Sequence, residues 1–151
     1  MAFSETELAL AGEDPQVVAE RCAAAMATGD RALGALGVSV DAVAPERATA
    51  RMTVTEAMVN GHGMAHGGFV FALADTAFAY ACNSAGRPSV ARQCEIVFLR
   101  PVRVGDHLTA TAELRAKAGG GGIYDVRVTR EDGVAVAELR GHSATLRPRG
   151  A

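Results

Sequence analysis

One segment of this sequence has the pattern of a buried helix: His66-Gly-Gly-Phe-Val-Phe-Ala-Leu-Ala-Asp75-Thr-Ala-Phe-Ala-Tyr-Ala-Cys-Asn-Ser-Ala-Gly86. Between Gly68 and Cys82 the only charged residue is Asp75, which lies among Phe, Val, Leu, Ala and Tyr. A helix that is apolar on all sides is normally buried, and this run is too short, and too interrupted by Asp75, to span a membrane. We therefore expect a core helix that the rest of the chain wraps, with a carboxylate placed inside.

Asp75 is the first candidate for a functional residue. An ionised carboxylate in apolar surroundings is costly unless it is hydrogen-bonded or paired, and such groups are common at active sites. The alternative is a structural carboxylate that accepts a hydrogen bond from a neighbouring backbone N–H. The burial pattern alone favours neither interpretation.

The segment before the helix, Asn60-Gly-His-Gly-Met-Ala-His66-Gly-Gly, is too rich in glycine to be a stable helix itself. Glycines at a helix N-terminus leave backbone N–H groups uncovered and let a ligand approach, as in an oxyanion hole. Gly67 and Asp75 are eight residues apart, which is about 12 Å along one helix. If both act on one substrate, two helices must therefore lie antiparallel across a two-fold axis, giving two equivalent sites per dimer.

Composition limits the class of protein. The 151 residues, with a net charge of -2 and 49% hydrophobic content, predict one globular domain. The absence of a basic excess disfavours nucleic acid as a partner. The first residues lack the basic region of a signal peptide and no segment has a transmembrane pattern, so we expect a cytoplasmic protein without a membrane partner. The three cysteines, an odd number without metal-like spacing, are expected to be reduced and mostly buried thiols.

The predicted elements alternate between helix and strand patterns. A loose arm is expected over residues 1–14, and Asp14 followed by Pro15 predicts a helix that continues to about Met26. A further helical turn is expected at residues 31–36. The expected strands are residues 38–43, 48–54, 90–99, 107–114, 123–130 and 134–146, the last four linked by hairpins, with a loop at 115–122. This order predicts an α+β fold in which an antiparallel sheet curls around one helix.

Residues 59–83, from Val59-Asn-Gly-His to Ala-Cys-Asn83, resemble the hotdog-fold acyl-CoA thioesterases, and among them the phenylacetic acid degradation (PaaI) type. Phe98-Leu-Arg-Pro101, Gly105-Asp106 and Ile123-Tyr-Asp125 fall where that family has similar segments. The resemblance implies a hotdog fold that forms a double hotdog dimer, and usually a homotetramer. We therefore divide the single domain, 1–151, into an N-terminal arm and helix (1–30) and a hotdog core (31–146).

The resemblance also implies roles for individual residues. Asp75 would be the general base or nucleophile, and the Gly67 N–H would polarise the thioester carbonyl across the dimer. Asn60 and His66 would line the same site, and Thr76 would help to hold the water or the carboxylate. Further contacts with the CoA thioester are expected from Gly68, Phe98, Leu99 and Arg100.

The expected function is hydrolysis of a CoA thioester, carrying a phenylacetyl or another aryl or medium-length acyl group, to the free acid and CoA. Coenzyme A is part of this substrate, so no separate cofactor is expected. Two alternatives stay open: a hotdog hydratase or dehydratase, in which Asp75 and His66 would form an acid–base pair, and a non-catalytic acyl-CoA-binding protein. The paired glycines and Asn60 favour the thioesterase.

Other chemical motifs have simpler interpretations. His62 and His66 are four residues apart, but the glycines between them argue against the helix that would place both on one metal, so no metal site is expected. Gly119–Gly122 is not followed by Lys-Ser/Thr, which favours a flexible hairpin loop over a phosphate-binding loop. His107 and His142 are expected to be isolated strand or loop residues, and Asn60 can equally be a turn former.

Overall fold

The computed structural model describes residues 11–147. Its helices are α1 (Pro15–Gly29), α2 (Arg31–Leu36), α3 (Gly67–Asn83) and a short 3-10 helix, η2 (Glu56–Met58). Its strands are β1 (Val38–Ala44), β2 (Arg47–Thr53), β3 (Ser89–Phe98), β4 (His107–Ala118), β5 (Gly121–Arg130) and β6 (Ala135–Thr145). The expected order of elements is confirmed, while residues 1–10 of the predicted arm lie outside the described residues.

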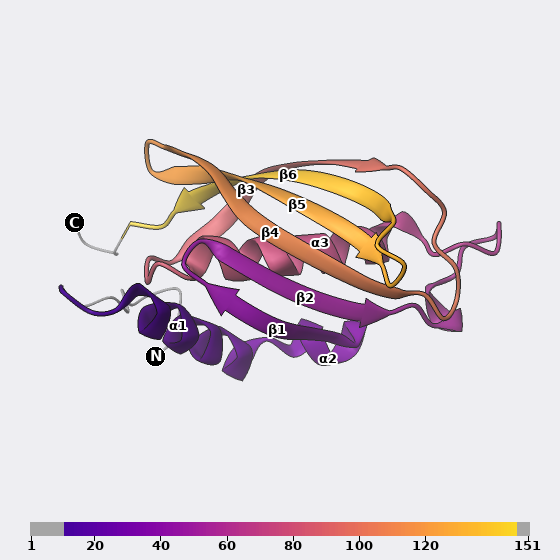
Figure 1. Cartoon of the computed structure of the whole chain (residues 1–151), viewed down its shortest axis with the longest axis horizontal. Coiled ribbons are helices and arrows are strands. Elements are labelled where there is room, and N and C mark those ends of the chain that lie inside the picture. The colour runs from indigo at the N-terminus through magenta and orange to yellow at the C-terminus, as the bar shows by residue number, and fades with distance from the viewer. Residues whose placement is uncertain (1–10, 148–151) are drawn as a thin grey trace.

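A single antiparallel sheet with strand order β1-β2-β4-β5-β6-β3 curls around α3 (Figure 1). The side chains that face the helix form the core. Phe78 and Leu73 of α3, Met52 of β2 and Leu108 of β4 are at most 2% exposed. Gly141 of β6 approaches α3 so closely that a Cβ there would lie 2.6 Å from Phe78 Cε1. The predicted α+β hotdog architecture is thus confirmed.

The position of β3 differs from the expected run of hairpins. β3 pairs with β6, from Ser89 opposite Thr145 to Phe98 opposite Ala137, and not with β4. After Phe98 the chain crosses the end of the sheet instead of turning back. The Leu99 and Arg100 N–H groups both donate to the Val136 carbonyl, and Pro101, which has no N–H, cannot extend the ladder. The crossing segment is held where the Ala65 N–H donates to the Val102 carbonyl over 2.8 Å. As a result β3 is an edge strand.

The predicted loop at 115–122 is wrong. β4 extends to Ala118 and β5 begins at Gly121, so only a two-residue turn separates them. The glycines reflect close packing as well as turning: a Cβ at Gly121 would overlap the Ser143 carbonyl oxygen of β6, whereas Gly119 has φ +56 in the turn. The register of β4 against β5 shifts at a bulge between Leu114 and Ala116, and the pairing then continues to Ala118 opposite Gly121.

Helix α1 packs against β1 and α3, at the left of the molecule in Figure 1. Its start is as predicted, because the Asp14 side chain caps it by accepting the Gln16 N–H at 2.9 Å. The Tyr80 hydroxyl of α3 donates to Asp30, at the end of α1, over 3.3 Å. These contacts fix the C-terminal turns of α1 beside α3.

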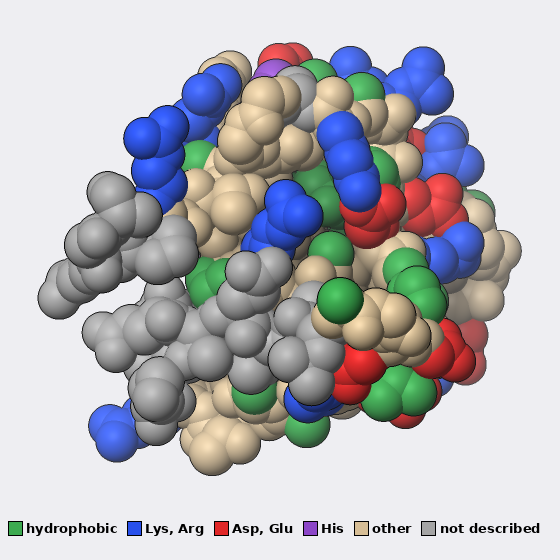
Figure 2. All heavy atoms as spheres, turned by 90° about the vertical axis from the view of Figure 1, so that its left-hand side faces the viewer, with side chains coloured by type: hydrophobic (Ala, Val, Ile, Leu, Met, Phe, Trp, Pro, Cys, Tyr) green, Lys and Arg blue, Asp and Glu red, His purple; other side chains and the backbone are tan. Residues whose placement is uncertain are grey.

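The surface has two features that bear on function. Figure 2 shows that acidic and basic side chains both lie on the face that is at the left in Figure 1. Edge strand β3 leaves Val90, Val97 and Phe98 between 47% and 52% exposed, which is unusual for an edge without a partner.

Within residues 11–147, no helix has the length and apolar character needed to cross a membrane.

Candidate active site

The N-terminus of α3 has one free backbone donor. His66 is the N-cap residue, and its Nδ1 accepts the Gly68 N–H at 2.9 Å, so the ring proton of the neutral imidazole lies on Nε2. The Phe69 N–H donates to the His66 carbonyl at 3.0 Å. Within residues 11–147 the Gly67 N–H has no acceptor. The first turn therefore presents the Gly67 amide, and not the Gly68 amide, to a ligand.

Asn60 organises the loop that leads to this helix. Its Oδ1 accepts the His62 N–H at 2.9 Å and the Met64 N–H at 3.3 Å, while its own N–H donates to the Met64 carbonyl at 2.8 Å. Asn60 therefore acts as a turn former here, with its carboxamide oxygen occupied and its NH2 group available. No cluster of three metal-binding side chains forms among the described residues.

A cavity of about 500 Å³ opens beside the N-terminus of α3. It is lined by Met64, Ala65, Gly67, Val70, Phe98, Leu99, Arg100, Pro101, Val102 and Val136. The Phe98 ring covers Gly67 so closely that a Cβ on Gly67 would be 2.8 Å from Phe98 Cζ. Arg100 is held by a hydrogen bond from Nη1 to the Ala135 carbonyl at 2.8 Å. The structure thus brings together most of the residues predicted to contact CoA, with Gly68 outside the lining.

Asp75 lies further along α3, beside a different cavity. Its side chain is half-buried, and burial raises the pKa of its carboxyl above the usual aspartate value. Within residues 11–147 the Asp75 carboxylate has neither a hydrogen-bond donor nor a cationic partner. A purely structural role would require it to accept a hydrogen bond from a neighbouring backbone N–H, and no such bond is present in the described chain. The neighbouring Thr76 hydroxyl donates to the Ala72 carbonyl at 2.8 Å, which leaves its oxygen free to accept.

The cavity beside Asp75 has a volume of about 290 Å³. It is lined by Met26, Asp75, Ala79, Cys82, Asn83, Pro88, Ser89, Val90, Ala91 and Leu146. Sequence reasoning missed the contributions of Met26 and Leu146, which come from outside the central segment and carry no motif. It also missed Cys82, although a spacing of seven residues, two helical turns, places it on the same face as Asp75.

Two thiols share the surroundings of Asp75. Burial, with a smaller effect from the Asp75 charge, raises the pKa of Cys82 to about 12. The same two causes raise the pKa of Cys94 on β3. Both thiols are free and uncharged at neutral pH, so they contribute apolar surface near the carboxylate.

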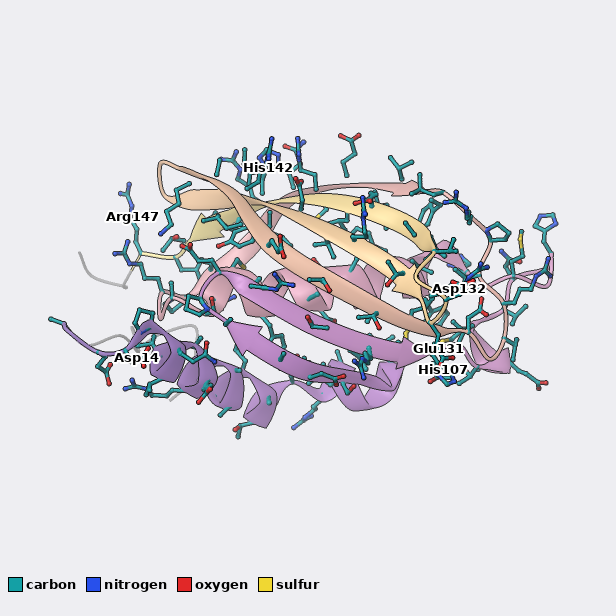
Figure 3. The ribbon with its side chains drawn as sticks, viewed as in Figure 1. Asp14, His107, Glu131, Asp132, His142 and Arg147 are labelled. Atoms are coloured by element: carbon teal, nitrogen blue, oxygen red, sulfur yellow. The ribbon has the colours of Figure 1, made fainter. Side chains whose placement is uncertain are left out.

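The remaining histidines lie away from one another. Figure 3 shows His107 at the end of the molecule near Glu131 and Asp132, and His142 on the upper side of the sheet. His107 Nδ1 is 2.8 Å from the Thr53 hydroxyl. The expectation of isolated histidines on strands is confirmed, since they belong to β4 and β6.

Residues 62–137 match the Thioesterase superfamily, and they include both Gly67 and Asp75. The chain belongs to this family. It is 47% identical to the acyl-coenzyme A thioesterase PaaI of Escherichia coli K12 over 119 residues, which are 79% of this chain and 85% of that protein. The structure of the E. coli PaaI protein superposes with a TM-score of 0.86 at 43% identity, covering 89% of this chain and 97% of the other.

Two more distant structures share the fold. A variant of the phenylacetic acid degradation protein PaaI from Thermus thermophilus has a TM-score of 0.74 at 38% identity, covering 78% of this chain and 100% of the other. A Streptococcus mutans protein bound to acetyl CoA has a TM-score of 0.69 at 23% identity, covering 72% of this chain and 88% of the other, a likeness of fold alone.

Proposed function

We propose that this protein hydrolyses acyl-CoA thioesters, with Asp75 of one subunit acting on a carbonyl that the Gly67 amide of a partner subunit polarises. One observation carries the proposal: α3 has a backbone donor at its N-terminus and a half-buried carboxylate two turns later, each beside its own cavity and each without a partner among residues 11–147. Family membership and the similarity to an E. coli acyl-CoA thioesterase support it.

Neither cavity alone contains both groups, so the proposed site needs a second copy of the chain. Antiparallel pairing of two β3 edges would place the Phe98 end of one strand beside the Ser89 end of the other. Phe98 lines the Gly67 cavity and Ser89 lines the Asp75 cavity, so the two cavities would meet twice around the axis. The pairing would also cover the exposed apolar side chains of β3. We propose this double hotdog, and its further association into a homotetramer, as the active form.

The proposed reaction follows from these groups. The thioester oxygen accepts the Gly67 N–H while Asp75 removes a proton from water, whose oxygen bonds to the carbonyl carbon. The resulting oxyanion collapses, the C–S bond breaks, and CoA leaves as a thiolate that takes up the proton, giving the free acid and CoA. If Asp75 attacks directly, its oxygen bonds to the carbonyl carbon, the C–S bond breaks and CoA leaves as a thiolate. Water then hydrolyses the anhydride to the free acid and the Asp75 carboxylate, and the thiolate takes up the proton that is released. In both routes a raised pKa makes the carboxylate a stronger base.

Several neighbouring groups support this assignment. The Thr76 oxygen is free to accept a hydrogen bond from the attacking water. The guanidinium of Arg100 keeps unbound N–H groups that suit the phosphates of CoA. His66 Nδ1 accepts the Gly68 N–H in the helix cap, so a hydratase mechanism would have only Nε2 of His66 for proton exchange. We extend the proposal to aryl or medium-length acyl groups, no separate cofactor, and a cytoplasmic location, where three free thiols would stay reduced.

The test is release of free CoA from a panel of purified CoA thioesters. Asp75→Asn should lower turnover by about 10²-fold or more, because a positioned base contributes about 10²–10⁴-fold. Asp41→Asn is the matched control, since Asp41 lies on β1, at the opposite edge of the sheet, and pairs with Arg51. Near-normal hydrolysis by a folded Asp75→Asn protein would exclude Asp75 as the base, and hydrolysis of no thioester by the wild type would exclude the function.

A further inference from the structure

The cavity beside Asp75 presents almost entirely apolar chemistry. The side-chain amide of Asn83 already has hydrogen-bond partners within the chain. Its Nδ2 donates to the Ala79 and Ser89 carbonyls at 2.9 and 3.0 Å, and its Oδ1 accepts the Ser89 N–H at 2.7 Å. The Cys82 thiol donates to the Ala79 carbonyl at 3.4 Å. The Ser89 hydroxyl is within hydrogen-bonding distance of the Arg87 carbonyl at 3.2 Å and of Thr145 Oγ1 at 3.4 Å. Among the lining side chains, the Asp75 carboxylate is therefore the charged group that can act on a ligand.

The cavity extends from Asp75 along α3 towards its C-terminus. Asp75, Ala79 and Asn83 follow at one-turn intervals on one face of the helix, so the lining covers about 12 Å of helix length. A cavity of about 150 Å³ lined by apolar side chains can hold benzene, and the volume here is about 290 Å³. This space suits an aromatic ring on a short linker or a medium-length alkyl chain whose carbonyl stays near Asp75.

Two of the walls come from outside the segment that matches the family. The match covers residues 62–137, whereas Met26 belongs to α1 and Leu146 follows β6. Met26 is held in place because α1 is fixed at both ends, by the Gln16 Nε2 bond to the Val43 carbonyl at 3.0 Å and by the Tyr80–Asp30 bond. The family segment thus supplies Asp75, and residues outside that segment supply two of the limits of the space around it.

We propose that this cavity receives the acyl group of the thioester, and that Met26 and Leu146 determine which acyl groups fit. The inference rests on the proposed thioesterase function and adds the residues that set its specificity. A larger side chain at either position would exclude bulky acyl groups but leave room for an acetyl group near Asp75. A smaller side chain would admit longer ones.

The experiment compares kcat/KM for acetyl-, hexanoyl-, decanoyl- and phenylacetyl-CoA in Met26→Trp, Met26→Ala and Leu146→Trp. A change of one methylene in an apolar pocket alters selectivity by roughly 10–200-fold, so Met26→Trp should lower phenylacetyl or hexanoyl relative to acetyl hydrolysis by at least about tenfold. Met26→Ala should move the preference towards decanoyl. Val17→Trp is the matched control, because Val17 lies on the same helix, is 51% exposed and is outside the cavity lining.

Leu146→Trp keeps the test decisive if Met26→Trp does not fold, because Leu146 is 37% exposed and lies outside α1. Acyl profiles equal to the wild-type profile in folded, active variants at both positions would overturn the assignment of this cavity. That result differs from failure of the proposed function, in which the wild-type protein would hydrolyse none of the four thioesters.

Discussion

If the active site is shared between two subunits, mixed dimers of two inactive variants should regain activity. Gly67 and Asp75 are separated by about 12 Å on one helix, so each site must combine Gly67 of one subunit with Asp75 of the other. A dimer of one Asp75→Asn subunit and one subunit lacking the Gly67 N–H has both defects in one site and none in the other. A site within one subunit would instead be defective in both copies.

Gly67→Pro removes the amide hydrogen at a position where the helix can accept a proline. Proline is favoured at the first helical position, and His66 before it has ψ 131, which is compatible with a following proline. The added ring would meet the end of the Phe98 side chain, which must shift to make room for it. Gly67→Ala is the matched control, because it makes a similar contact with Phe98 and keeps the N–H.

Losing one oxyanion donor costs about 10²–10³-fold in kcat, so Gly67→Pro and Asp75→Asn should each be nearly inactive alone. After co-production in equal amounts, half of the dimers are hybrids with one intact site, and free-CoA release should recover to about one quarter of the wild-type rate. Co-production of Asp75→Asn with the Asp75→Asn/Gly67→Pro double variant leaves no intact site and should recover nothing. Activity of the first mixture no higher than that of its parents would refute the shared site.

Burial raises the pKa of Asp75, so kcat/KM should fall as pH drops through a value above the usual aspartate pKa of about 3.9; a profile flat down to pH 4 would contradict its role. Ionised Asp75 also destabilises the fold above that raised pKa, so Asp75→Asn should resist denaturant better at pH 7, and the gain should vanish below the unfolded pKa. Gly141→Ala should lower the free energy of unfolding by about 1–3 kcal/mol, because its Cβ would press on the buried Phe78 ring. Gly120→Ala, with no atom within 4 Å, is its control in denaturant unfolding.

The elements that depend on local pattern were predictable. The Asp14-Pro15 start of α1, the glycine approach to α3 and the alternation in β2, β4 and β5 appear as expected because capping, glycine placement and period-two burial are local properties. The loop at 115–122 was mispredicted for a related reason. Gly121 resembles a flexible residue in sequence, but its lack of a side chain is required by the close approach of Ser143 on another strand.

The sequence by itself determined the central helix, its single acid and the uncovered amide before it, because these lie within one continuous segment with its own periodicity. Only the tertiary structure decided that β3 is an edge strand, that Asp75 and Gly67 face separate cavities, and that Met26 and Leu146 border the carboxylate. These are contacts between residues far apart in the chain. Their positions follow from how the sheet closes around the helix, which no local pattern specifies.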